Sequence, residues 1–539
     1  MPGVAKVPGM TPTAAGSGSG TRSGSDSDPS ELWRWSARDL SAALRRREVS
    51  AREALDAHFA RIDAVNPQLN AVVIEDREGA RERAAQADER SAALGDARAD
   101  ELPPLHGLPM THKDTHNVAG IRSTSGSKLT DVVPAADDLI VARLRAAGVN
   151  PTGKNNVPEF AAGSHTFNDL FGATGNPYAP DLSCGGSSGG AGVAVATGIQ
   201  SLAEGSDMGG SLRNPAAFCN VVGFRPSLGV VPLVPTRDAW AWLARTGPMA
   251  REVADIALAM TVLTGPDARI AYDCPVAADA FAPLIEASAD PDARPLEGVR
   301  IGFTLDFGLG VPLDAEVARV VGEQRAVFEA LGARVDDVAP NLRTADLVFD
   351  AARAIDMAIK LRELVTRHPD GVKPEVRWNV QHGLQLTGDE LMDATLARTR
   401  LRGELERWFS RYDVLVAPTS QVLPFPFDQR YPEVIAGQQM GSYVEWMRSC
   451  TLVSAMGGPA ISMPAGFGRA ADGRELPVGL QIAGRHGADV EVLRIARAYE
   501  AATRHVDRRP DVGDRSAGAA GAGSSARADR LPPRGSGHL

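Results

Sequence analysis

The stretch EGSDMGGSLRNPAAFCNVVGFRP, residues 204–226, decides both the fold and the chemistry that the chain can perform. Met208, Gly209, Gly210 and Ser211 offer consecutive backbone N–H groups. The two glycines let the backbone curve into a concave nest and let a substrate approach closely. Such a nest can stabilise the negative oxygen that develops when a carbonyl group is attacked. We therefore take Ser211 as the candidate nucleophile.

Two segments upstream supply matching groups. CGGSSGGAGVAVATG, residues 184–198, contains Ser187 and Ser188 and then small residues that predict a closely packed internal helix. LPMTHKDT, residues 108–115, places Lys113 directly after an apolar run. Together the three segments contain the hydroxyls, the backbone donors and the base that acyl transfer from an amide requires.

Lys113 is a candidate base because lysine, unlike arginine, can lose its proton when burial lowers its pKa. Only six of the 57 Lys and Arg residues are lysines, so a lysine in this position is noteworthy. The alternative, an ion pair between Lys113 and the adjacent Asp114 at the surface, is disfavoured beside the two Gly/Ser segments.

The motifs GGSSGG and GSDMGGSLRNPA, with Lys113 lying 74 residues before Ser187, resemble the amidase signature family over roughly residues 35–505. The resemblance implies an α/β fold with a central twisted mixed β-sheet covered by helices on both faces. It also implies an amidase that hydrolyses carboxamide C–N bonds of a small molecule to an acid plus an amine or ammonia. No metal and no cofactor is implied.

The same resemblance implies a Ser–Ser–Lys triad. Ser211 corresponds to the nucleophile that becomes the acyl-enzyme, Ser187 to a bridging serine after a cis peptide bond, and Lys113 to the general base. Met208, Gly209, Gly210 and Ser188 are the expected oxyanion and substrate-binding residues. The chain departs from the common family pattern at Ser206, Met208 and Leu212, where Thr, Thr and Ile are frequent. We expect Asp207 and Arg213 to be structural supports, and the segments 238–245 and 420–447 to face the substrate.

Several short motifs compete with this interpretation. The run from Gly148 to Lys154 approaches a phosphate loop, but Asn155 replaces the required Ser or Thr and a helix precedes it. His112 and His116 have zinc-ligand spacing within a segment that predicts a loop. Ser125 and Lys128 match S-x-x-K without its partner motifs, and Ser188 centres a G-x-S-x-G pattern that lacks the preceding apolar strand.

Two functional alternatives stay open. The A subunit of a tRNA-dependent amidotransferase has the same triad and hydrolyses glutamine, but typically has Gln where this chain has Asn214. A non-catalytic amidase-like binding protein would have lost the nucleophile, whereas Lys113, Ser187 and Ser211 are all present.

Composition bounds the remaining possibilities. Residues 1–30 and 507–539 are rich in Gly, Ala, Ser and Pro and predict disordered tails around one amidase domain, residues 31–506. The net charge of −10 is spread among interspersed acids and bases and points to no nucleic acid partner. No apolar stretch of membrane-spanning length exists, so we expect no membrane association and a cytoplasmic location. The sequence leaves a homodimer open.

Overall fold

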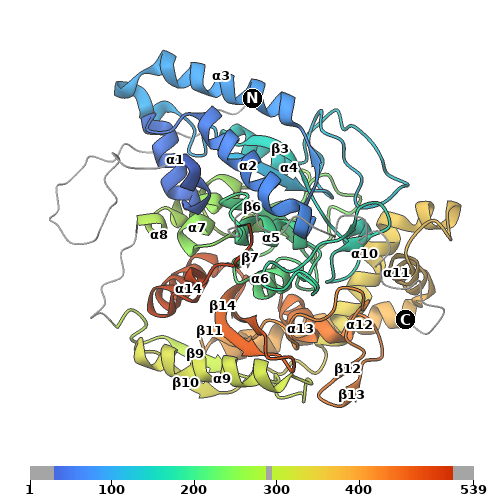
Figure 1. The fold of residues 1–539 in the computed structure, drawn as a ribbon. Helices are drawn as coiled ribbons and strands as arrows, with labels where there is room; N and C mark the ends of the chain where they lie inside the picture. Colours follow the sequence, from blue (N-terminus) through green and yellow to red (C-terminus); the bar gives the residue numbers. More distant parts are fainter. Residues whose placement is uncertain (1–28, 287–293, 514–539) are drawn as a thin grey trace.

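A large mixed β-sheet organises the protein (Figure 1). The computed structural model describes residues 29–286 and 294–513. The sheet has eight strands in the order β10-β9-β11-β15-β14-β7-β8-β6. Their bounds are β6 (Leu202–Asp207), β7 (Val222–Arg225), β8 (Arg245–Ala250), β9 (Arg300–Phe303), β10 (Arg334–Asp337), β11 (Val414–Pro418), β14 (Ala460–Arg469) and β15 (Glu475–Gly484).

Strand directions within this sheet are mixed. Strand β9 pairs in parallel with β10 and β11, and every pairing from β11 through β15, β14, β7 and β8 to β6 is antiparallel. The predicted central mixed sheet is therefore confirmed. The predicted strands at 299–305, 412–418 and 459–466 correspond to β9, β11 and β14.

Helices cover both faces of this sheet. In strand β15, Gly479 lies against Ala217 of helix α6 (Arg213–Cys219), and Gly484 lies against Val492 of helix α14 (Asp489–Thr503). Because these glycines are five positions apart in an extended strand, they face opposite sides of the sheet. Helix α9 (Ala315–Ala330) also packs on β14 and β15.

A second, smaller sheet carries Lys113. It has three strands in the order β1-β3-β2, with bounds β1 (Val72–Glu75), β2 (Pro109–Lys113) and β3 (Asn150–Asn155). Strand β2 lies against β6, the edge strand of the large sheet. Lys113 is the last residue of β2, so it sits where the two sheets meet.

The remaining helices surround these sheets. The larger ones are α1 (Ala37–Arg46), α2 (Ala51–Leu69), α3 (Arg77–Leu94), α4 (Leu139–Ala146), α5 (Gly189–Ala196), α7 (Val253–Leu263), α10 (Ala345–Arg367), α11 (Pro374–Gln385), α12 (Gly388–Phe409) and α13 (Arg448–Met456). Helix α5 contains only buried residues, as the small side chains of residues 190–198 predicted. Ser50 and Glu53 form the capping box that begins α2.

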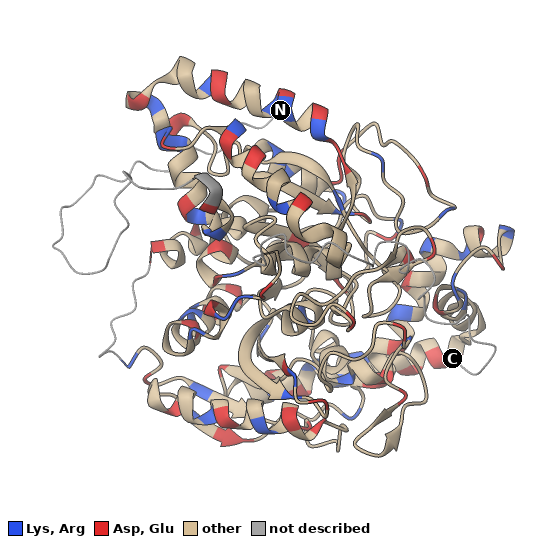
Figure 2. Ribbon diagram, in the orientation of Figure 1, with Lys and Arg blue, Asp and Glu red and all other residues tan. Residues whose placement is uncertain are grey.

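Acidic and basic residues alternate along outer helices such as α3 and α9 (Figure 2). This distribution agrees with the interspersed charges of the sequence. Within residues 29–286 and 294–513, no helix is both long and apolar enough to cross a membrane.

The predicted domain limits, residues 31 and 506, lie close to the ends of the described chain. The expected tails fall mostly on residues 1–28 and 514–539, which lie outside the described residues. A short 3₁₀ helix already begins at Pro29, and Val512 is buried within the main hydrophobic core. The segment after residue 506 is therefore attached to the body, by Val512 in the core and by hydrogen bonds from Arg61 to the Val512 carbonyl at 2.9 Å and from Tyr178 to the Arg508 carbonyl at 2.6 Å.

Candidate functional site

The side chain of Lys113 is fully buried among three hydroxyl groups. Its Nζ lies 2.8 Å from Ser187 Oγ, 2.8 Å from Ser188 Oγ and 2.9 Å from Ser206 Oγ. The backbone N–H of Lys113 donates to Glu204 Oε1 at 2.9 Å. Strand β6 supplies both Ser206 and Glu204, so the contact between the two sheets positions the lysine.

Burial lowers the pKa of Lys113 to about 7, against the opposing pull of the Glu204 and Asp207 carboxylates. The three hydroxyls can satisfy the neutral form as well as the ammonium form. A neutral amine has two N–H groups and one lone pair, and each hydroxyl can either accept or donate a hydrogen bond. The site can therefore hold an uncharged amine with every hydrogen-bonding position occupied. Such an amine can take a proton near neutral pH.

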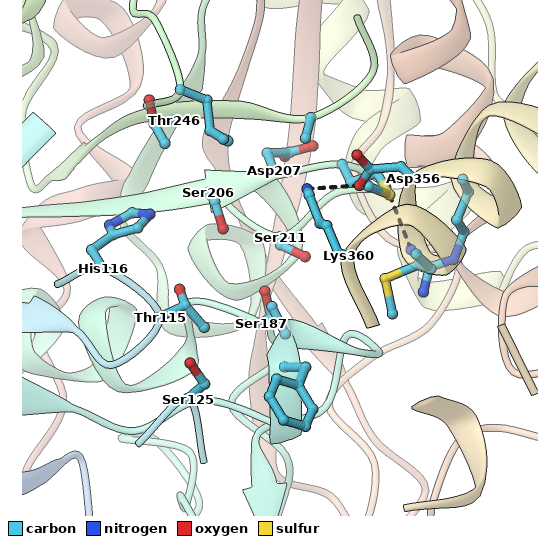
Figure 3. A pocket seen from close by; sticks show the side chains of 18 of the residues that line it. Thr115, His116, Ser125, Ser187, Ser206, Asp207, Ser211, Thr246, Asp356 and Lys360 are labelled. Atoms are coloured by element: carbon cyan, nitrogen blue, oxygen red, sulfur yellow. Dashed lines mark hydrogen bonds and ion pairs between the residues drawn. The ribbon is translucent and has the colours of Figure 1, made fainter. Parts of the chain in front are cut away.

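The two candidate serines lie on neighbouring loops. Ser187 precedes helix α5, and the peptide bond between Gly186 and Ser187 is cis, as the family resemblance implied. Ser188 donates its backbone N–H to the carbonyl of Ser211 at 3.2 Å, which ties the two loops together. The hydroxyls of Ser187 and Ser211 face the same part of a cavity (Figure 3). Among the described residues, the Ser211 hydroxyl has no hydrogen-bond partner, so it is available to a substrate.

Asp207 organises the loop that carries Ser211. It accepts hydrogen bonds from the backbone N–H of Gly210 at 3.0 Å and of Leu212 at 3.1 Å, and from the Arg213 guanidinium at 2.9 and 3.0 Å. Burial acts to raise the pKa of Asp207, but Arg213 and Arg225 hold it below its ordinary value. Asp207 and Arg213 thus have the supporting positions that the sequence analysis expected.

The backbone donors around Ser211 are not equivalent. The N–H of Gly210 points to Asp207, away from the cavity role that the sequence analysis gave it. Within the described part of the chain, the N–H groups of Met208, Gly209 and Ser211 have no acceptor. Gly210 has φ +112°, and a Cβ there would lie 2.7 Å from that of Cys450, so the turn requires glycine.

A cavity of about 270 Å³ opens in front of the two serines (Figure 3). Its walls come from the loops that carry the serines, from the segment 232–235, from one face of helix α10, and from residues 115–116, 125, 138, 140, 160–161 and 163–164. The lining residues of the first three groups are Ser187, Ser206, Asp207, Met208, Gly209, Ser211, Pro232, Leu233, Val234, Pro235, Arg353, Asp356, Met357, Lys360 and Leu361. The sequence analysis did not anticipate the contributions of 232–235 and α10.

The two segments expected to face the substrate contribute little. Only Ala244 of 238–245 and Met447 of 420–447 line the cavity. Four aromatic side chains of 420–447 instead belong to a separate hydrophobic cluster: Phe425, Tyr431, Tyr443 and Trp446. Trp240 is 69% exposed, and Trp242 packs beneath Arg398. Their aromatic content indicated recognition of a substrate, but packing explains most of it.

The residues of two competing motifs, the histidine pair and the near phosphate loop, lie beside Lys113. His112 lies on strand β2, not on a loop as predicted, and His116 follows in a turn where its Nδ1 bonds Glu204 Oε2. Lys154 is buried and donates to the backbone carbonyls of Lys113 and His116. Across the residues that the structure describes, no group of three or more His, Cys, Asp or Glu side chains is placed to hold a metal ion.

Comparison with known proteins agrees with the geometry. The amidase family model matches residues 53–493. An acylamidase of Rhodococcus erythropolis is 35% identical over 479 residues, covering 88% of this chain and 97% of that protein. The A subunit of the glutamyl-tRNA(Gln) amidotransferase of Moorella thermoacetica is 34% identical, covering 90% of this chain and 99% of that protein.

A bacterial aryl acylamidase structure superposes with a TM-score of 0.79 at 28% identity, covering 88% of this chain and 98% of that one. These similarities, with the serine- and glycine-rich loops around a buried lysine, define an enzyme of the amide-hydrolysing class. The chain belongs to the amidase signature family.

Proposed function

We propose that the protein hydrolyses the C–N bond of a small-molecule carboxamide through Ser211, Ser187 and Lys113. The observation that carries this proposal is the hydrogen bond between Lys113 Nζ and Ser187 Oγ, made by a lysine whose pKa burial lowers to about 7. A base of that pKa is half deprotonated at neutral pH and can still return its proton to a leaving group.

The reaction begins with two coupled proton transfers. Neutral Lys113 takes the proton of Ser187 while Ser187 takes that of Ser211, whose Oγ attacks the carbonyl carbon. The oxyanion forms beside the N–H groups of Met208, Gly209 and Ser211, which have no other acceptor among the described residues. Ser187 Oγ and Ser211 Oγ make no hydrogen bond in this structure, so the proton transfer requires the two hydroxyls to approach each other when the substrate binds. Catalytic hydrogen bonds commonly tighten only in the substrate complex.

Collapse of this intermediate breaks the C–N bond. The proton held by Lys113 returns through Ser187 to the departing nitrogen, so the amine or ammonia leaves neutral and Ser211 carries the acyl group. Water then repeats the sequence on the ester carbonyl and releases the acid. Ser188 and Ser206 hold Lys113 in place throughout, since each bonds Nζ without a described side-chain contact to Ser211.

The cavity supports a small-molecule substrate. Its volume of about 270 Å³ suits a molecule of modest size, and its lining combines apolar side chains with a few polar groups. The acylamidase and the aryl acylamidase are similar to this chain over nearly its full length, and both names describe amide hydrolysis.

Glutamine hydrolysis as an amidotransferase A subunit is the second candidate. It is favoured by the 34% identity to the Moorella protein over 90% of this chain. An assay on the purified chain separates the two. The proposal expects release of amine from acyl anilides and simple amides without any partner protein, whereas the alternative expects glutaminase activity that rises when its partner proteins are added.

The triad is tested by Ser211→Ala, Ser187→Ala and Lys113→Ala, each assayed on the best substrate of an amide panel. We expect every variant to lose at least about 10³-fold in kcat, in line with removal of a member of a catalytic triad. A fluorophosphonate should label Ser211 in the wild type. Retention of most activity by Ser211→Ala, or no labelling at Ser211, would refute the proposal.

A further inference from the structure

Arg353 is a buried cation on the cavity wall. It belongs to helix α10, is 6% exposed and lines the cavity in front of Ser211. Its guanidinium donates to Asn379 Oδ1 at 2.9 Å, to Tyr443 OH at 2.6 Å and to Met208 Sδ at 3.5 Å. All three partners are neutral, and the thioether sulfur is a weak acceptor.

Two other carboxylates of the cavity lining already have a cationic partner. Asp356 Oδ2 accepts from Lys360 at 2.7 Å, although Asp356 Oδ1 has no hydrogen-bond partner among the described residues, and Asp207 is paired with two arginines. The hydrogen bonds of Arg353 within the described residues all go to neutral groups, and none goes to a carboxylate. A buried charge without an opposite partner is costly, so its presence calls for a compensating group.

The guanidinium of Arg353 also has N–H groups that make no hydrogen bond to a side chain in the described part of the chain. Arginine carries five N–H groups in a planar fork, and three hydrogen bonds to side chains account for three of them. Asn379 and Tyr443 hold the fork in place from helix α11 and from the segment before α13. A fixed fork with free donors is the arrangement that binds carboxylates in proteins.

The position of Arg353 relates it to the reacting atoms. Its Nη1 contacts Met208, three residues before Ser211. One turn earlier on α10, the ring of Phe349 lies against Gly209, since a Cβ on that glycine would be 2.9 Å from Phe349 Cζ. Arg353 therefore faces the cavity beside the loop that carries the nucleophile.

We propose that Arg353 binds a carboxylate of the substrate, so that the preferred amides carry a carboxylate group a few bonds from the scissile carbonyl. This inference rests on the amidase function proposed above and narrows its substrate class. The substrate carboxylate forms an ion pair with the buried guanidinium of Arg353 and replaces its weak hydrogen bond to the sulfur of Met208. A hydrogen bond to a charged group contributes about 1.5–3 kcal/mol, which corresponds to roughly 10–100-fold in kcat/KM.

Matched substrates test the proposal, each pair differing in a carboxylate and the isopropyl group of similar shape. The first pair has the carboxylate on the acyl side: glutaric mono-p-nitroanilide and 5-methylhexanoyl p-nitroanilide. The second has it on the amine side: N-butyryl-4-aminobenzoate and N-butyryl-4-isopropylaniline. We expect the wild-type enzyme to prefer the carboxylated member of at least one pair by tenfold or more in kcat/KM.

Variants assign that preference to Arg353. Arg353→Gln should lower kcat/KM for the carboxylated member to the value for the neutral member, so that the preference is lost, and Arg353→Lys should keep part of the preference because the charge remains without the fork. Arg448→Gln is the matched control. Arg448 also contacts α10, through Asp346 at 2.7 Å, but does not line the cavity. Melting temperatures of all variants report on folding.

Binding supplies a readout that does not need turnover. Calorimetry on the Ser211→Ala protein should give at least tenfold tighter binding of the carboxylated member, and Arg353→Gln in that background should abolish the difference. Equal binding and equal kcat/KM within both pairs would overturn the proposal, as would an Arg353→Gln variant that loses both members equally. Hydrolysis of neutral amides alone would leave the amidase function standing, whereas no hydrolysis of any amide would count against that function.

Discussion

The amine of Lys113 lies 2.8 Å from the hydroxyl of Ser187, and the lysine has no solvent-exposed surface. The candidate base therefore communicates with the cavity through a hydroxyl and not directly. Because the amine of Lys113 is kept away from water, its pKa is lowered. Ser187, in contrast, lines the cavity and can exchange protons with groups there.

Activity should rise with pH through about 7. Lys113 works as a base only when deprotonated, and burial places its pKa at about 7, so kcat/KM should increase between pH 5.5 and 8 and then level off. The measurement is a pH profile with a neutral amide, whose own charge does not change. Lys113→Arg, which cannot deprotonate, should be inactive at every pH. A flat profile would show that another group limits the reaction.

The free energy of unfolding should also depend on pH through the lowered pKa of Lys113. Lysine in the unfolded chain has a pKa of about 10.4, so between about pH 7 and 10 the unfolded state binds a proton that the folded state lacks. The contribution of Lys113 to the free energy of unfolding then increases with pH, by up to about 1.4 kcal/mol per unit. Below about pH 7 both states are protonated and the contribution levels off at its lowest value.

Urea denaturation of the wild type and of Lys113→Met at pH 7, 8 and 9 measures this effect. The difference, wild type minus variant, should grow toward pH 9. A difference that shrinks with increasing pH would mean that the folded protein keeps Lys113 charged.

Much of the fold could be predicted because local patterns agree with packing. The cap formed by Ser50 and Glu53, the helix after Asp314 and the run DVLVAP each depend on residues close in sequence, and each forms the expected element. The smaller sheet was not expected, because the pairing of β2 with β3 and of β3 with β1 depends on contacts between distant segments.

Part of the candidate site could also be predicted from local sequence motifs, and part could not. Ser187, Ser211 and Lys113 stand in long, distinctive motifs, and the structure places the two serines on one cavity with the lysine behind Ser187. Ser206 was noted only as a departure from the family pattern, although it contacts the lysine at 2.9 Å. The cavity wall of α10 was missed because Arg353 and Lys360 resemble the polar residues of an ordinary surface helix.

The three serines around Lys113 should differ in importance. Ser187→Ala should abolish activity, because it removes the hydroxyl between Lys113 and the cavity. Ser188→Ala and Ser206→Ala each remove one of three contacts to Nζ and should lower kcat by only about 10–100-fold, consistent with loss of one hydrogen bond to a charged or reacting group. Steady-state kinetics on one amide ranks them. A Ser206→Ala variant as inactive as Ser187→Ala would contradict this division of roles.

Asp207→Asn should destabilise the protein by about 3–5 kcal/mol, because it leaves the buried guanidinium groups of Arg213 and Arg225 without their counter-charge. Urea denaturation measures the loss. Asp337→Asn is the control, since that carboxylate is 78% exposed and its pair with Arg325 should contribute at most about 1 kcal/mol. If both substitutions lowered the free energy of unfolding by the same amount, Asp207 would not be the residue that organises this loop.

Gly205→Ala should impair activity through Ser188. A Cβ at Gly205 would lie 2.4 Å from Ser188 Oγ and 2.9 Å from Leu212 Cδ2, so the Lys113 contact and the nucleophile loop must both shift. We expect a loss of at least about tenfold in kcat, since small displacements of catalytic groups have large effects. Gly322→Ala on α9, where nothing lies within 4 Å, should leave kinetics unchanged and stabilise the helix by about 1 kcal/mol.

Helix α10 touches both the cavity and the backbone beside Ser211, through Arg353 and Phe349 respectively. A change of side chain that adapts this helix to a new substrate therefore also presses on, or releases, the loop of the nucleophile. As related enzymes diverge, substitutions on helix α10 that change the substrate range should therefore change the turnover rate as well. New specificities would arise with an initial penalty in rate, recovered by later changes on the opposite side of Gly209.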